Sequence, residues 1–257
     1  MTEDKNSSES KELSGLGSYW YWVYIVALSF SFIVFIALNA YNKPFTVEGF
    51  RYFRYTLCFA IFIIVIGISN SILANPNVCG KYDFRKGFLL ALFPFVFIFG
   101  LGVVVLEFIF PGWIRGFANT FGMLFVNLAD VKGFLQQNMN QEQDFSKFYE
   151  DPIPIFKELT TDGFTLGEDG KILWPQVDRL ISNDVFKGLM RDNEKNQFMT
   201  TLYNYVMSKD AVSYCIWYIL LGIITIQSTI IMILNDNDCL RGAKDNKTFS
   251  KFMKTST

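Results

Sequence analysis

Four long apolar blocks alternate with polar stretches along this chain. They run from about Tyr19 to Asn39, Tyr55 to Leu73, Gly87 to Phe110 and Tyr214 to Leu234. A helix that crosses a bilayer needs roughly 20 predominantly apolar residues, and each block is close to that length. The pattern therefore predicts four transmembrane helices. The first block is longer than a usual signal-peptide core, so we expect it to be retained as a span.

The stretch 112–212, between the third and fourth blocks, is too long for a simple connector. Its first part, from Ile114 to about Gln137, has the spacing of a helix with one apolar side. The positions on that side are Phe117, Phe121, Leu124, Phe125, Leu128, Phe134 and Leu135. Such a helix either lies along the bilayer surface or packs back on the spans as ordinary core. The sequence leaves both possibilities open.

The rest of this stretch predicts shorter elements. Two prolines interrupt the chain within Asp151–Phe156. Short apolar arms around a Glu-Asp-Gly sequence predict a small hairpin or turn over Phe164–Trp174. A helix is expected to begin at Pro175, and another covers roughly Asn193 to Met207, with continuation into the fourth block as one option.

Together these elements predict a mainly α protein, a four-helix transmembrane bundle with a mostly helical soluble insert between spans 3 and 4. The expected parts are a flexible acidic head (1–17), spans 1–3 (18–111), an amphipathic helix and soluble insert (112–212), span 4 (213–235) and a flexible tail (236–257). An even number of spans places both termini on one face. The excess of lysine and arginine on that face favours cytosolic termini.

Aromatic and basic residues lie at the edges of the apolar blocks, where tryptophan and arginine suit the interface between bilayer and water. The predicted membrane-interface anchors are Trp20, Trp22, Trp113, Arg115 and Trp217.

Composition and charge exclude several classes of chemistry. The formal net charge of −1 gives no global basic field, which argues against nucleic acid as a partner. Histidine is absent, which removes histidine-based general bases, triads and metal sites. The sequence has no phosphate-binding glycine loop, nucleophile elbow or zinc-type cysteine pair. We therefore predict no enzyme activity, no catalytic or metal-ligating residues and no cofactor.

Glu107 is the only ionisable residue within the four blocks. It lies one turn before the Pro-Gly-Trp sequence at Pro111–Trp113, where a carboxylate can reach interfacial water. An anchor role is favoured over a role in an ion pathway. A membrane pore or transporter is nevertheless kept as the alternative function.

The four cysteines are placed in two pairs of similar depth. Cys79 precedes the third block and Cys239 follows the fourth, so both lie at the membrane edge on the face that carries the termini. Cys58 and Cys215 lie near the start of their blocks on the other face and are best explained as free thiols. Similar depth does not establish lateral proximity, so Cys79 and Cys239 are a candidate disulfide with free thiols as the alternative.

Three segments in this order and spacing resemble a family of multi-span membrane proteins from the nucleocytoplasmic large DNA viruses. They are NVCGKYDFRKGFLLALFPF, FPGWIRGFANTFGMLF and AVSYCIWYILLGIITIQSTIIMILNDNDC. The positions that carry the resemblance are Cys79-Gly80, Pro111-Gly112-Trp113, Phe117–Gly122, Ile216-Trp217-Tyr218 and Cys239. Ala118 stands where the family pattern has a serine. The resemblance covers roughly the second to fourth spans.

This resemblance implies a structural protein of the virion, a minor capsid component in the internal membrane beneath an icosahedral shell. Its implied partners are the lipid bilayer and capsid or other minor capsid proteins, copies of itself included. Such viruses look equipped with their own thiol oxidases, which implies a route to a disulfide between Cys79 and Cys239. The candidate interaction surface of the insert is Phe117, Asn119, Phe121, Phe164 and Trp174.

Overall fold

The computed structural model describes residues 22–37, 47–75, 79–80, 82–139, 151–168, 171–187 and 192–236. These residues are mainly helical, as predicted. Three helices are long and apolar enough to cross a membrane, namely Gly49–Ala74, Phe84–Ile109 and Asp192–Leu234. They contain the second, third and fourth apolar blocks, which is consistent with a membrane protein. The first block is represented by a shorter apolar helix, Trp22–Ala37, and its two ends lie outside the described residues.

The chain divides into two compact units. Unit 1 comprises residues 1–29, 55–110 and 217–257, and unit 2 comprises residues 30–54 and 111–216. Two helices contribute to both units, α2 (Val47–Ala74) and α11 (Asp192–Leu234).

The third apolar block of unit 1 is a helix with locally widened turns. α3 (Phe84–Pro94) is followed by the π-helical turn η1 (Phe95–Gly100), then α4 (Leu101–Val104) and a second π-helical turn, η2 (Val105–Ile109). A kink is expected at Pro94, because proline lacks a backbone N–H and its ring displaces the preceding turn. A π-helical turn at this place is one way in which a helix accommodates such a disturbance.

Unit 1 is held together by polar contacts between its helices. The Tyr24 hydroxyl, which is fully buried, donates to the carbonyl oxygen of Tyr218 at 2.6 Å. The Ser69 hydroxyl donates to the carbonyl oxygen of Gly87 at 2.9 Å. A Cβ atom at Gly222 would collide with the Tyr24 hydroxyl, so only glycine permits this approach. Small residues and interhelical hydrogen bonds of this kind are typical of helix contacts in a bilayer.

The polar end of α3 is fixed by two acidic side chains. Asp83 is the N-cap residue, and its carboxylate accepts a hydrogen bond from the backbone N–H of Lys86 at 3.2 Å. The Lys86 ammonium in turn donates to the carboxylate of Asp236 at 2.8 Å. This ion pair joins the beginning of α3 to the residues that follow α11.

Residues 30–54 contribute an aromatic cluster to unit 2. The rings of Phe35 and Phe53 stack with centroids 4.3 Å apart, and Phe50 meets Tyr214 edge-on at 5.5 Å. The Arg54 guanidinium lies 4.2 Å from the centroid of the Tyr214 ring. A cation over an aromatic face is attracted by the ring quadrupole, which compensates Arg54 for its burial.

The prediction of a single helix from Ile114 to Gln137 is wrong. The chain instead forms α5 (Pro111–Phe117), the π-helical turn η3 (Ala118–Gly122), α6 (Met123–Leu128) and α7 (Val131–Asn138). The break lies at Asp130, which has a left-handed backbone with φ of 55°. Its carboxylate accepts from the backbone N–H of Gly133 and so caps α7.

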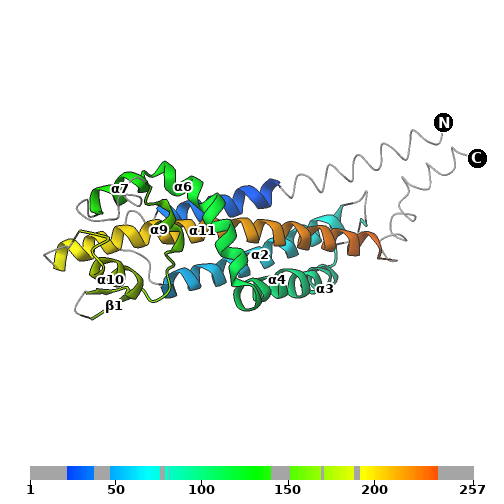
Figure 1. Ribbon diagram of the computed structural model, residues 1–257. Helices are drawn as coiled ribbons and strands as arrows, with labels where there is room; N and C mark the ends of the chain where they lie inside the picture. The colour runs from blue at the N-terminus through cyan, green and yellow to red at the C-terminus, as the bar shows by residue number, and fades with distance from the viewer. Residues whose placement is uncertain are drawn as a thin grey trace, which may run out of the picture. The chain divides into compact units, whose positions relative to one another are not determined.

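The remaining elements of unit 2 are short and lie along the N-terminal part of α11 (Figure 1). They are α9 (Ile153–Glu158), β1 (Thr165–Leu166), β2 (Ile172–Leu173) and α10 (Pro175–Ser182). β1 and β2 pair antiparallel, with Thr165 opposite Leu173, which confirms the predicted hairpin. The helix expected over Asn193–Met207 continues without a break to Leu234.

Candidate functional site

One face of α11 binds the segment 111–129 through side chains spaced four residues apart. Residues at this spacing lie above one another on a helix. The three donors are Tyr205, Lys209 and Ser213. They reach the carbonyl oxygen of Ala129 at 3.0 Å, the amide oxygen of Asn119 at 3.3 Å and the carbonyl oxygen of Ile114 at 2.7 Å, respectively. Partner numbers fall as α11 numbers rise, so the two segments are antiparallel.

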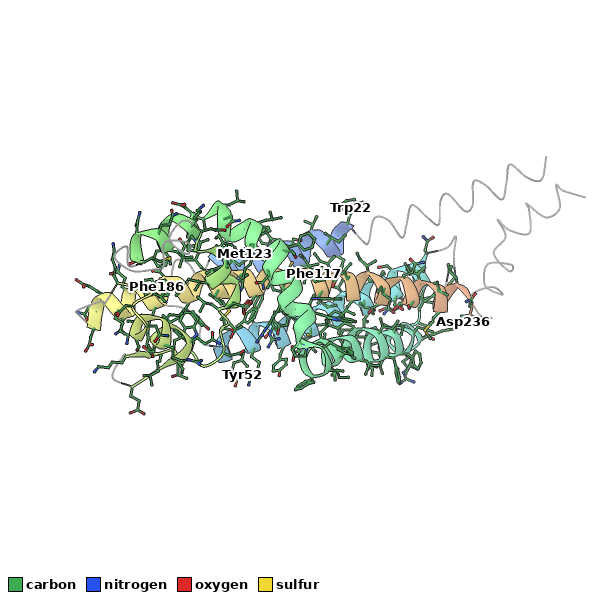
Figure 2. All side chains as sticks on the ribbon, in the orientation of Figure 1. Trp22, Tyr52, Phe117, Met123, Phe186 and Asp236 are labelled. Atoms are coloured by element: carbon green, nitrogen blue, oxygen red, sulfur yellow. The ribbon has the colours of Figure 1, made fainter. Side chains whose placement is uncertain are left out.

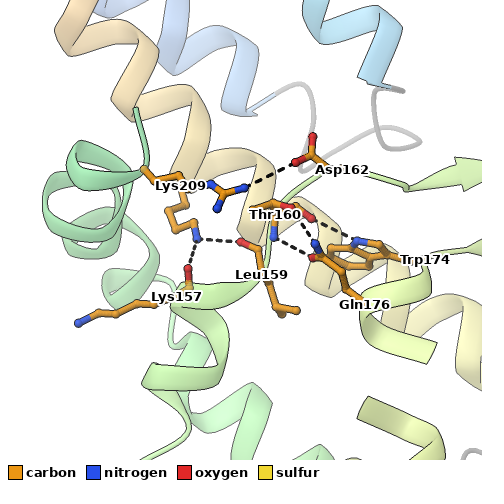
Figure 3. A network of polar contacts seen from close by, with 8 residues as sticks. Lys157, Leu159, Thr160, Asp162, Trp174, Gln176 and Lys209 are labelled. Carbon is orange, nitrogen blue, oxygen red and sulfur yellow. Dashed lines mark hydrogen bonds and ion pairs between the residues drawn. The ribbon is translucent and has the colours of Figure 1, made fainter. Parts of the chain in front are cut away.

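Lys209 is the centre of this contact and is only 2% exposed. Its ammonium donates to the carbonyl oxygens of Phe156 (3.5 Å), Lys157 (3.3 Å) and Leu159 (3.0 Å), as Figure 3 shows in part. The ammonium also lies 5.3 Å from the centroid of the Phe156 ring. These carbonyls belong to the C-terminal end of α9, where the helix dipole favours a cation. The carbonyl oxygen of Phe156 also accepts from the backbone N–H of Leu159 at 3.2 Å. Lys209 thus joins α9 and η3 to α11.

The close approach of η3 to α11 depends on a glycine. Gly122 is buried, and a Cβ atom at this position would lie 2.5 Å from the backbone carbonyl oxygen of Lys209. A helix backbone cannot yield as a flexible side chain can, so any other residue would push the two elements apart.

The opposite side of α11 packs against the hairpin. The Phe164 ring stacks on Tyr203 with centroids 3.7 Å apart, and Trp174 meets Tyr203 edge-on at 5.8 Å. The Trp174 indole N–H donates to the carbonyl oxygen of Thr160 at 3.2 Å (Figure 3). Phe164 and Trp174 are both buried, Trp174 completely. The prediction that these two side chains belong to an interaction surface is therefore wrong, because they form the core of the insert.

The apolar side of η3 and α6 points outward. Its members have between 47% and 86% of their surface exposed; they are Phe121, Leu124, Phe125 and Leu128. The buried side carries Ala118, Met123 and Val126 instead. Figure 2 labels Met123 and the neighbouring Phe117 on this segment. The alternative that this helix packs as ordinary core is thus wrong for these four side chains. It holds only in α7, where Leu135 is buried and Phe134 stacks on Phe198 at 5.5 Å.

The other predicted site residues are dispersed. Trp22 and Trp113 are exposed, and Trp217 is half-buried. Arg115 is exposed and forms a long ion pair of 3.9 Å with Asp162. Trp20 lies outside the described residues. A position of these anchors at a membrane interface stays a prediction.

Two residues of the candidate surface remain next to the outward face of α6. Phe117 is half-buried and stacks on Phe121 with centroids 5.6 Å apart, while Asn119 accepts from Lys209. Asn119 therefore helps to orient the segment and does not form part of its outer face.

The hydrophobic pattern of the sequence does not identify Lys209 as a structural centre. The residue stands next to the fourth apolar block, where a cation is usually explained as a topology determinant. The signal that was available is its spacing of four from Tyr205 and Ser213. A spacing of four residues places Tyr205, Lys209 and Ser213 on the same face of a helix.

Cys79 forms a disulfide, whereas Cys58 and Cys215 are free thiols, as predicted for those two. The expected partner, Cys239, lies outside the described residues, so the pairing stays a prediction.

We expect non-reducing digestion of the purified protein to give a linked peptide that contains Cys79 and Cys239 and disappears on reduction. Direct alkylation should modify Cys58 and Cys215 without a reductant. A linked peptide that joins Cys79 to either of those two would contradict the expected pairing.

Glu107 is half-buried within the π-helical turn η2. Among the described residues, no group of three or more cysteine and acidic side chains is arranged to hold a metal ion. The contacts around Lys209 and Gly122 provide a scaffold, and η3 and α6 carry an outward apolar face.

Comparison of this chain with protein-family models, with curated proteins and with solved structures gives no match.

Proposed function

We propose that this protein is a structural integral membrane protein, with four transmembrane helices and the insert 112–212 between spans 3 and 4. It resembles a minor capsid component that anchors the inner membrane of a large DNA virus to its icosahedral shell. Three helices of spanning length support the membrane part of the proposal. The apolar helix Trp22–Ala37 supports the fourth span, because it accounts for most of the first apolar block. The proposal includes no enzymatic activity.

The observation that carries this proposal is that α11 belongs both to the fourth apolar block and to the insert. One uninterrupted helix of 43 residues supplies both the apolar fourth block and the residues around which the insert is built. Tyr203 packs against the hairpin, and Lys209 binds α9 and η3. An anchor has to connect a membrane span directly to a folded binding part. A continuous helix provides that connection without a flexible linker.

The partners in this proposal are the lipid bilayer and proteins of the capsid, other minor capsid proteins and further copies of this chain included. The hairpin offers exposed apolar side chains for a protein contact, Leu166 and Leu173. Leu166 ends β1 and Leu173 ends β2, whereas Phe164 before β1 and Ile172 in β2 are buried in the insert. The proposed location is the inner membrane of the virion, with host endomembranes as the site of assembly.

The proposal is tested by protease protection on purified particles. We expect the protein to resist a salt wash, to co-purify with the capsid and to keep residues 151–187 protected until the shell is removed. A chain with Leu166→Asp and Leu173→Asp should reach the membrane but enter fewer particles. Finding the wild-type protein only in host membranes, with a cleavable insert and none in particles, would reject the viral proposal.

A pore or transporter remains the second candidate, since Glu107 is the one ionisable residue of the third block. Three hydroxyl side chains in the described parts of the spans weigh against it. The hydroxyls of Ser69, Thr225 and Thr229 each donate to a backbone carbonyl, so they are satisfied within the protein. Conductance in reconstituted liposomes that disappears in Glu107→Gln would favour the pore over the anchor.

A further inference from the structure

The segment Pro111–Leu128 has an apolar outer face, and contacts between its inner side and α11 fix the orientation of that face. Lys209 and Ser213 of α11 hold its inner side, and Gly122 sets the close approach. Tyr205 holds Ala129, which follows the segment directly. The side chains on the outer side therefore cannot turn inward without breaking these contacts. They are Trp113, Phe121, Leu124, Phe125 and Leu128.

The composition of this segment suits hydrocarbon more than water. No charged residue occurs from Gly116 to Ala129, and charges resume at both ends with Arg115 and Asp130. Thr120 is exposed, but its hydroxyl donates to the carbonyl oxygens of Gly116 (2.9 Å) and Phe117 (3.2 Å). Its polar group is thereby satisfied within the helix, which is the usual arrangement for a hydroxyl that faces lipid.

Chain continuity places the beginning of this segment at a membrane. Pro111 follows the helix Phe84–Ile109, which is long and apolar enough to span a bilayer. That helix ends at Phe110, whose φ of −128° and ψ of 59° are not helical. Helix α5 is therefore a new helix that starts where this apolar helix ends in the chain. Exposed apolar residues stand on both sides of this point in the sequence, Phe108 and Ile109 before it and Trp113 after it.

We propose that Pro111–Leu128 is an interfacial helix that inserts its outer apolar face into the lipid surface. Helices with an aromatic-rich apolar face and no charge on that face bind at the boundary between headgroups and acyl chains. The occupant of the face is thus the bilayer itself. The inference requires only a membrane span before Pro111, so it does not depend on the viral proposal.

The experiment uses the full chain in phosphatidylcholine vesicles that contain a phosphatidylcholine with a diazirine in its acyl chain. After irradiation, lipid adducts are mapped by mass spectrometry. We expect adduct yields at Phe121–Leu128 roughly tenfold above those at Leu166 and Leu173 and similar to those at Phe97 in the span. The two hairpin leucines are a matched control, because they are apolar and comparably exposed but do not follow a span.

A variant separates lipid contact from simple exposure. Leu124→Glu combined with Leu128→Glu changes two outward side chains, so the fold of the insert should be retained, as checked by its thermal unfolding. Adducts at residues 121–128 should fall at least several-fold, while those at 84–109 stay unchanged. Adducts in the wild-type segment no higher than at the hairpin would overturn the proposal. A protein, a second copy of the chain included, would then be the occupant.

Discussion

Replacing Lys209 with methionine is expected to lower the free energy of unfolding by about 3 kcal/mol. Methionine keeps much of the length and apolar body of the lysine but removes the ammonium. The carbonyl oxygens of Lys157 and Leu159 and the amide oxygen of Asn119 would then lose their common donor. The carbonyl oxygen of Phe156 would keep only the backbone N–H of Leu159. Buried acceptors without a donor carry their full desolvation cost, which is why the loss exceeds that of an ordinary hydrogen bond.

Thermal unfolding in detergent, followed through tryptophan fluorescence, measures this effect. For a chain of this size, the loss corresponds to a fall of roughly 6–12 °C in Tm. Lys157→Met is the matched control, since that side chain is exposed and should change stability by no more than about 0.5 kcal/mol. Equal Tm values for the two variants would show that Lys209 does not hold α9 to α11.

Alanine at two glycines of the same segment is expected to act in opposite directions. Gly122→Ala should destabilise the protein by about 2 kcal/mol, because the new methyl group meets the carbonyl oxygen of Lys209 at 2.5 Å. Gly116→Ala should stabilise it by about 0.5–1 kcal/mol, because alanine is the better helix former and a Cβ atom there meets nothing within 4 Å.

The two variants control for each other. Each adds one methyl group, and the two positions, Gly116 and Gly122, belong to the same helical segment. Thermal unfolding of both variants under identical conditions gives the signs directly. The close approach of η3 to α11 would be refuted if Gly122→Ala were as stable as Gly116→Ala. In the double variant the two effects should add, except for any coupling through the shared helix.

The helices that are long and apolar enough to cross a membrane could be predicted from the sequence, because their signal is long and depends on composition alone. The block from Gly87 to Phe110 needs no knowledge of its neighbours to be assigned. The break at Asp130 is different. Apolar periodicity continues across it, and the left-handed backbone that ends α6 is stabilised by a local cap that leaves no mark on the hydrophobic pattern.

The insert was harder to predict for a related reason. The hairpin could be expected from its turn sequence, but the burial of Phe164 and Trp174 could not, because it depends on Tyr203 in a distant helix. The apolar side of η3 and α6 shows the reverse case. Phe121 and Leu128 have the pattern of core residues, and only the contacts on the other side of the segment establish that they face outward.

The dependence of the insert on α11 has a consequence for synthesis. Ile114 and Ser213, which are joined by a hydrogen bond, are 99 residues apart in the chain. Asn119 and Lys209 are 90 residues apart. At about 5–20 residues per second, the ribosome needs on the order of several seconds to cover that interval. The segments that precede α11 therefore exist before the helix that buries them. During this time Phe164 and Trp174 lack their partner Tyr203, so we expect this protein to be most vulnerable to aggregation and to chaperone binding while α11 is still being made.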